Sequence, residues 1–226
     1  MQSRPGWGKP PAMTASRNRA SSTAMTEPAP LHAIAPARAL DHVVLPVSGL
    51  ATARQRLTAL GFTVAPDAIH PFGTENCCVF LADGTYLEPL GIDKRETCEA
   101  AAIKGNVFVA RDQAYRFRRG EDGFSALAFA TADAAADHRR FVKTGISAGR
   151  MLEFSRVFDD GKGEKRDLGF RLAFAADLRA PDAFFFTCER VNHAAADRGS
   201  LTRHANGVVS IREIAMSEVN PADFQY

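Results

Sequence analysis

Two residues of this chain combine a chemically active side chain with an apolar setting, His42 and Glu88. His42 lies in residues 40–47, a run rich in β-branched residues that predicts a strand. Glu88 lies among apolar neighbours in a second predicted strand. Removing an unpaired carboxylate from water costs several kcal/mol, so a buried Glu88 needs a metal ion, a cation or a proton. The plainer alternatives are an exposed edge position or an ion pair with Arg156 or Arg171 for Glu88. For His42 the plainer alternative is a hydrogen-bonded packing role.

Glu88 belongs to residues 70–90, which read as a turn, a strand, a tight turn and a second strand. Asp83-Gly84 between two apolar runs is a strong hairpin signal, because both turn positions can take a positive φ. On the second strand, an alternation of period two places Glu88 on the same face as Tyr86.

The composition is that of an ordinary globular protein, with 46% hydrophobic and 24% charged residues among 226. No apolar run approaches the roughly 20 residues that cross a bilayer, so we expect no membrane partner. The four cysteines lack zinc-like spacing, and a reducing, cytoplasmic setting is the default. The net charge of +2 is the sum of +4 in residues 1–40 and −2 in the remainder. The near-neutral remainder gives no electrostatic case for nucleic-acid binding.

Residues 1–38 are rich in Pro, Ala, Ser, Thr and Arg and have no hydrophobic periodicity. Such a segment buries too little apolar surface to offset the entropy of ordering, so we predict that it is disordered. It is similar in composition to an organelle transit peptide. A flexible tail, or a true start at Met25, explains it equally simply.

The predicted elements follow the order β-α-β-β-β twice, which indicates an α+β fold. In the first module, residues 39–92, they are a strand at 40–47, a helix at 49–60, a strand at 62–65 and the hairpin. A shift of 84 positions lays residues 124–131 on 40–47, and residues 132–144 on the first helix. The rest of the second module, residues 123–192, consists of predicted strands at 151–158, 166–175 and 183–190.

Two segments lie outside the modules. Residues 93–122 predict a helical connector that packs onto the sheet through Ala101, Phe108, Tyr115 and Phe117. Residues 193–226 form a C-terminal extension, in which a strand at 211–218 starts an incomplete third module. The unpaired strand edge of such a module favours pairing with a second copy of the chain.

Three motifs resemble those of one branch of the vicinal oxygen chelate superfamily, the glyoxalase-like domain proteins. They are Asp41-His42 before three apolar residues, His70-Pro-x-Gly-Thr74-x-Asn76, and Gly84-Thr-Tyr86-Leu-Glu88. The superfamily also includes glyoxalase I, extradiol dioxygenases and the bleomycin-resistance proteins. The resemblance implies paired βαβββ modules that curl a mixed β-sheet into a cup with helices outside. Only the first module carries the motifs.

The resemblance also implies metal ligands on the first and fourth strands of each module. It assigns His42 and Glu88 to a divalent ion, Fe, Mn, Zn or Ni, and an imidazole with a carboxylate suits these ions. The second module departs from the pattern, because Ala126 takes the place of His42. Its fourth strand offers Glu189, and the incomplete third module offers Glu213, as a third ligand.

Several further polar residues are candidates for the lining of the cup. His70 is a candidate acid or base, or a third metal ligand, unless Pro71 and Gly73 merely shape a turn that it caps. The candidate substrate contacts are Thr74, Asn76, Tyr86 and Arg171. Tyr86 is otherwise a packing residue and Arg171 otherwise a solvated one.

We therefore expect a metal-dependent enzyme, a lyase, isomerase or dioxygenase, that acts on a small oxygenated compound in the cup. The alternative is a metal-free protein that binds or sequesters a small molecule, as the bleomycin-resistance members do. Ala126 favours the alternative, whereas His42 with Glu88 favours the enzyme.

Overall fold

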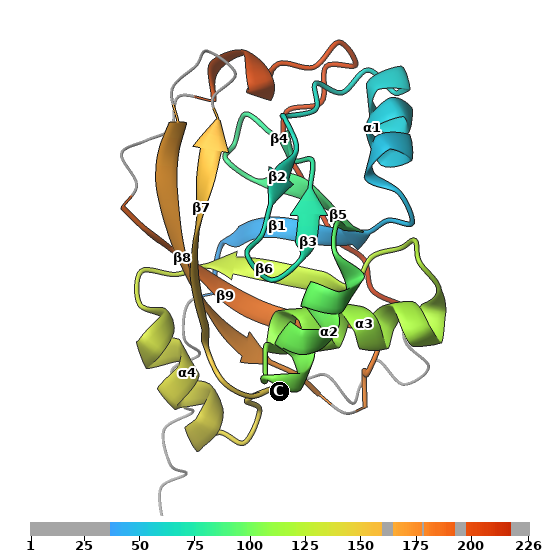
Figure 1. Cartoon of the computed structure of the whole chain (residues 1–226). Coiled ribbons are helices and arrows are strands. Elements are labelled where there is room, and N and C mark those ends of the chain that lie inside the picture. The colour runs from blue at the N-terminus through green and yellow to red at the C-terminus, as the bar shows by residue number, and fades with distance from the viewer. Residues whose placement is uncertain (1–36, 160–164, 178, 193–197, 218–226) are drawn as a thin grey trace, which may run out of the picture. The chain divides into compact units, whose positions relative to one another are not determined.

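The computed structural model describes residues 37–159, 165–177, 179–192 and 198–217 (Figure 1). The predicted disorder of residues 1–36 and the chain after residue 217 lie outside this part. Four α-helices and nine strands occur in the described part. The helices are α1 (Leu50–Ala59), α2 (Arg95–Ile103), α3 (Val107–Arg119) and α4 (Ala134–Lys143). None of them is long and apolar enough to span a membrane.

The strands join into one mixed, curled and nearly closed sheet, which confirms the α+β class. In the first half they are β1 (Leu40–Pro46), β2 (Ala68–Ile69), β3 (Thr74–Asn76), β4 (Val79–Phe80) and β5 (Tyr86–Ile92). In the second half they are β6 (Ala126–Ala130), β7 (Leu152–Asp159), β8 (Lys165–Ala175) and β9 (Phe184–Val191). The order across the sheet is β2-β3-β5-β1-β6-β9-β8-β7, with β4 paired to β5.

The two halves repeat one arrangement around the antiparallel pair β1–β6. Each half pairs its first strand in parallel with its last, β1 with β5 and β6 with β9. The end strands β2 and β7 lie side by side across the remaining gap (Figure 1). The interior of the cup is therefore bounded by strands from both halves.

The predicted hairpin is present. Phe80 pairs with Tyr86 across the turn, and Gly84 takes a φ of 93°. The carboxylate of Asp83 accepts hydrogen bonds from the backbone and hydroxyl of Thr85, which fixes the turn. This turn sets the register that points Glu88 into the cup.

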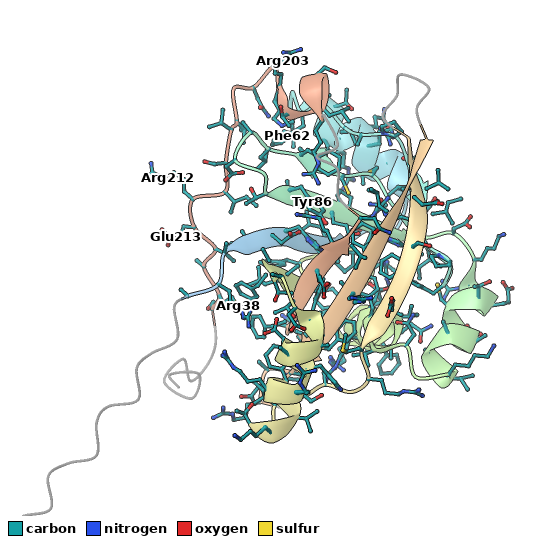
Figure 2. The ribbon with its side chains drawn as sticks, turned by 90° about the vertical axis from the view of Figure 1, so that its left-hand side faces the viewer. Arg38, Phe62, Tyr86, Arg203, Arg212 and Glu213 are labelled. Carbon is teal, nitrogen blue, oxygen red and sulfur yellow. The ribbon has the colours of Figure 1, made fainter. Side chains whose placement is uncertain are left out.

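The predicted strand at 62–65 is wrong, because this segment pairs with no strand. Ala65 bonds to the carbonyl of Cys78, and Thr63 bonds to the C-terminal part of the chain. The backbone N–H of Thr63 donates to His204, and its hydroxyl donates to the carbonyl of Arg203. Residues 211–217 form neither helix nor strand. The exposed Arg212 and Glu213 lie at the surface, away from the cup, so Glu213 is not near His42 (Figure 2).

The core fills the cup and the space beneath the connector. Phe174 and Phe186 are fully buried, and the connector contributes Phe108 and Val109 from α3. Phe117, expected to pack on the sheet, is 91% exposed. Aromatic side chains surround the few polar groups that remain inside.

Candidate functional site

The polar groups of the cup converge on a small internal cavity of about 30 Å³. A water molecule needs roughly 10–15 Å³ measured in this way, so the space suits an ion or two waters. Strands from both halves and helix α3 line the cavity: His42, His70, Phe72, Tyr86, Glu88, Phe108, Phe154, Arg156, Phe170, Leu172, Phe186 and Cys188.

A local irregularity of β1 positions His42. The pairing of β1 with β6 shifts register between Leu40 and His42, so that Asp41 is bypassed. Such an irregularity breaks the alternation of faces. The side chain of Asp41 consequently reaches that of His42, with Oδ1 2.6 Å from Nδ1. This contact orients the ring and leaves Nε2 facing the cavity.

On that side, Nε2 of His42 lies 3.2 Å from Oε2 of Glu88. Both side chains are buried, with 3% and 6% of the residue exposed. The ring of His42 also stacks on Tyr86, at 4.4 Å between centroids and 17° between planes. The strand pairing explains the stack, because His42 and Tyr86 are register partners of β1 and β5.

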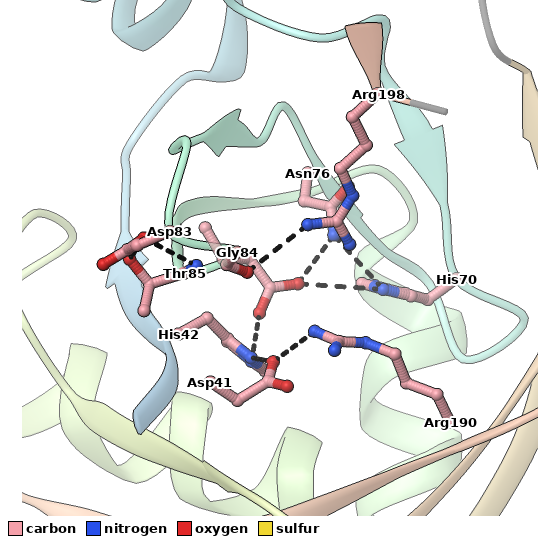
Figure 3. Close-up of polar contacts among 10 residues, drawn as sticks. Asp41, His42, His70, Asn76, Asp83, Gly84, Thr85, Arg190 and Arg198 are labelled. Atoms are coloured by element: carbon pink, nitrogen blue, oxygen red, sulfur yellow. Dashed lines mark hydrogen bonds and ion pairs between the residues drawn. The ribbon is translucent and has the colours of Figure 1, made fainter. Parts of the chain in front are cut away.

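A second set of contacts joins Glu88 to His70. The amide of Asn76 donates to Oε1 of Glu88 over 2.6 Å and lies 3.4 Å from Nε2 of His70. Nδ1 of His70 lies 2.8 Å from the hydroxyl of Thr74. Nε2 of His70 is 3.9 Å from Oε1 of Glu88. Figure 3 shows the contacts of Asp41, His42, Asn76 and His70 as one connected chain.

The surroundings set different protonation states for these groups. Burial alone would raise the pKa of Glu88, but its hydrogen bonds to His42 and Asn76 and the nearby imidazoles hold that pKa at about 2. Burial alone would lower the pKa of His42, but Asp41 and Glu88 raise it. Burial lowers the pKa of His70 to about 4. At neutral pH, Glu88 is therefore ionised and His70 is neutral.

Arginine side chains surround this network on the side of the second half. Nη2 of Arg190 lies 2.6 Å from Oδ1 of Asp41, which ties β9 to β1. Arg198 lies over the ring of Phe80, 4.0 Å from its centroid, and Arg156 lines the cavity itself. Of these three arginines, Arg156 is the one that brings its charge to the cavity lining.

Two residues assigned from the sequence lie elsewhere. Glu189 accepts a hydrogen bond from the backbone N–H of Ala134 at the start of α4. Arg171 is paired with Glu153 on the outer face, at 3.3 Å. Period two separates Glu189 from Phe186 and Cys188, which face the cavity. Glu189 therefore cannot join His42 and Glu88, and Arg171 does not reach the cavity.

The register shows which residues of the second half stand at the positions of His42 and Glu88. Val44 pairs with Glu88 in the first half, and Ala128, 84 positions after Val44, pairs with Phe186. Phe186 thus takes the place of Glu88, as Ala126 takes that of His42. At these two positions the second half contributes apolar side chains, and its charged contribution to the cavity lining is Arg156.

The donor atoms of His42 and Glu88 are spaced as two ligands of one metal ion would be. Two donors about 2.1 Å from one ion lie about 3.0–3.4 Å apart, and His42 Nε2 and Glu88 Oε2 match this separation. The carboxylate on Nδ1 of His42 is also typical of a ligating histidine. Among the described residues, no group of three His, Cys, Asp or Glu side chains could hold an ion. The pair fits a divalent ion whose other positions are left to water, substrate or neutral oxygens.

Sequence reasoning overlooked three contributors, namely Arg190, Arg198 and the orienting role of Asp41. Arg190 lies two residues after Cys188 and four after Phe186 on β9, so the alternation of a strand could have indicated that it lies on the same, inward face. Arg198 carries no comparable signal, since it precedes a short 3₁₀ helix (Gly199–Thr202) rather than lying on a strand.

A sequence model described as "Glyoxalase-like domain" matches residues 40–226. The chain belongs to this family, within the vicinal oxygen chelate superfamily. No curated protein shows significant similarity to the chain.

Several solved structures are similar to this chain at low identity. A hypothetical protein from Staphylococcus aureus is 17% identical, with a TM-score of 0.50; the match covers 66% of this chain and 58% of that one. Methylmalonyl-CoA epimerase from Mycobacterium tuberculosis is 19% identical, with a TM-score of 0.46 and coverage of 70% and 93%. The Streptomyces coelicolor epimerase bound to 2-nitronate-propionyl-CoA is 19% identical, with a TM-score of 0.43 and coverage of 67% and 96%. These likenesses concern the fold alone.

Proposed function

We propose that this chain is an enzyme that binds a divalent metal ion with His42 and Glu88 and moves a proton on a small oxygenated compound. The observation that carries the proposal is the buried pair of donor atoms, His42 Nε2 and Glu88 Oε2, 3.2 Å apart at the cavity. Members of this superfamily often use divalent metals. The ion would polarise a carbonyl or hydroxyl oxygen of the substrate.

Glu88 is assigned to ligation, because its pKa of about 2 keeps the carboxylate ionised at neutral pH as an oxygen donor for the ion. Asp41 keeps Nδ1 of His42 engaged, so that Nε2 is the atom presented to the ion. Loss of the Nε2 proton must accompany binding, which makes metal affinity increase with pH.

His70 is assigned to proton transfer. It is neutral at pH 7, since burial lowers its pKa to about 4, and its Nε2 makes long contacts, 3.4 Å to the amide of Asn76 and 3.9 Å to Oε1 of Glu88. Thr74 bonds Nδ1 and fixes the orientation of the ring. Phe72 stacks on the ring at 5.0 Å, which keeps bulk water from it. Proton transfer next to a ligated oxygen is lyase or isomerase chemistry, which we favour over dioxygenation.

The test is hydrogen exchange. The full chain, loaded with Mn²⁺ or Zn²⁺, is incubated in D₂O with a panel of small 2-oxo and 2-hydroxy compounds, and deuterium incorporation is followed by NMR. The proposal predicts exchange in at least one compound that is lost with EDTA and reduced 100-fold or more in His70→Gln. Exchange that is unchanged by EDTA and in His70→Gln contradicts it.

A second candidate is a metal-free protein that sequesters a small molecule, as bleomycin-resistance proteins do. The observation in its favour is the second half of the cup, where Ala126 and Phe186 stand at the positions of His42 and Glu88. It predicts saturable ligand binding without metal and without exchange.

A further inference from the structure

Arg156 lies on the cavity side of β7, next to the gap between β7 and β2. We infer that Arg156 binds the carboxylate of the substrate, so that the compound handled by this site is a small carboxylic acid. The inference rests on the proposed function, because it names the substrate class of the same site.

The first support is an unsatisfied donor. Nε of Arg156 is buried and has no hydrogen-bond partner. A buried donor left without a partner costs about 1–3 kcal/mol, and an acceptor oxygen on a ligand would remove that cost. The guanidinium lies 5.6 Å from the ring centroid of Phe170, which supports its plane without supplying an acceptor.

The second support is the distribution of charge. The two carboxylates of the network already have partners, since Glu88 bonds His42 and Asn76, and Asp41 bonds His42 and Arg190. In the part of the chain that the structure describes, no carboxylate forms an ion pair with Arg156. The positive charge beside the cavity is therefore available to an anion, and a guanidinium binds a carboxylate in a planar, bidentate manner.

The third support is position. Arg156 lines the inner cavity of about 30 Å³ and also a second cavity of about 50 Å³. The second cavity lies between β2, β4 and β7 and is bounded by Ala65, Pro66, Asp67, Ala68, Asn76, Cys78, Phe80 and Val157. Its carboxylate, Asp67, is already paired with Arg54. A ligand held at Arg156 can thus extend toward His42 and Glu88 on one side and toward the gap on the other.

The volumes limit the size of the acid. At roughly 10–15 Å³ for each water-sized group, each cavity admits only a few heavy atoms, so the acid is small. Pyruvate is a small acid that carries a 2-oxo group, and pyruvamide is a neutral compound of nearly the same shape. The two compounds differ mainly in the negative charge that Arg156 would bind.

The test is binding of pyruvate and pyruvamide to the EDTA-treated full chain, followed by calorimetry and by the shift of the unfolding temperature. We expect saturable binding of pyruvate and binding of pyruvamide at least tenfold weaker. Arg156→Gln should weaken pyruvate binding at least tenfold, whereas Arg171→Gln, which removes the same charge from the outer face, should leave it unchanged. Arg156→Lys keeps the positive charge but loses the planar, bidentate guanidinium, so it should bind pyruvate with an intermediate affinity. This variant keeps the test valid if Arg156→Gln does not fold.

Equal binding of the two compounds, an unchanged affinity in Arg156→Gln, or no binding of pyruvate would overturn the inference. Binding of inorganic phosphate in place of pyruvate would overturn the assignment to carboxylates. Mn²⁺ binding is measured separately on the same samples. Pyruvate binding that depends on Arg156 in a chain without affinity for Mn²⁺ would leave the inference standing and remove the proposed metal function.

Discussion

Asp41 and His42 are neighbours on one strand, yet Oδ1 of Asp41 lies 2.6 Å from Nδ1 of His42. In a regular strand their side chains would point to opposite faces. The register shift between Leu40 and His42 brings them together. The same oxygen of Asp41 accepts a hydrogen bond from Arg190, so the irregularity also connects the two halves of the sheet. His42 is thereby held in one orientation from both halves.

Replacing Asp41 should weaken the metal site without removing a ligand. In Asp41→Asn we expect Mn²⁺ or Zn²⁺ affinity to fall 10- to 100-fold, because the carboxylate on Nδ1 fixes the ring and increases its basicity. Calorimetric titration measures this. Asp122→Asn, on the exposed surface near Ser48, is the matched control. Equal affinities in the two variants would mean that Asp41 only stabilises the strand.

Arg190 should matter for stability more than an exposed arginine does. Arg190→Met leaves Asp41 buried beside His42 with one partner fewer, and breaking a buried pair from one side costs about 3–5 kcal/mol. Urea unfolding should show a loss at the lower end of this range, since His42 still pairs with Asp41. The double variant Asp41→Asn/Arg190→Met should recover part of the loss. Additive losses would show that the two side chains are energetically independent.

His70 should make the metal-free chain less stable in mild acid. Its pKa is about 4 in the folded chain against 6.5 when unperturbed. Between these values the unfolded chain binds more protons, so the free energy of unfolding falls as pH decreases from 6.5 to 4, by roughly 3 kcal/mol in all. The raised pKa of His42 changes the free energy of unfolding above pH 6.5, and the lowered pKa of Glu88 changes it below about pH 4.5.

The measurement is urea unfolding of EDTA-treated wild type and His70→Gln between pH 4.5 and 7.5. The variant should show a flatter dependence in this window. Parallel curves would argue that His70 is not buried in its neutral form.

Glu189 should contribute to helix α4 and not to the cavity. In Glu189→Ala the backbone N–H of Ala134 loses its acceptor, and loss of such an interaction at a helix start costs about 1 kcal/mol. Thermal unfolding should detect this loss, with metal affinity unchanged. A fall in metal affinity comparable to that of Glu88→Gln would restore Glu189 as a ligand.

The hairpin of the first half was predictable because its signals are local. The Asp83-Gly84 turn fixes its own register, and that register directs Glu88 inward. Alternation along β5 then places Tyr86 on the same face as Glu88. These inferences need only neighbouring residues, and the structure agrees with them.

The second half was predictable in order but not in register. The 84-residue shift correctly relates β6 to β1. In the second half, however, the last strand, β9, begins after a much longer hairpin, formed by β7 and β8. Phe186 therefore matches Glu88, although the sequence favoured Glu189. The contact of Asp41 with Arg190 spans 149 positions and depends on the pairing of β1, β6 and β9. No local pattern encodes it.

The most direct test of the account is metal stoichiometry in untagged protein, measured by mass spectrometry after equilibration with Zn²⁺ or Mn²⁺ and removal of the unbound metal. The account predicts about one ion per folded chain, lost in both His42→Gln and Glu88→Gln and retained in Glu189→Gln. No bound metal in the wild type, or equal metal in all four folded proteins, would contradict it.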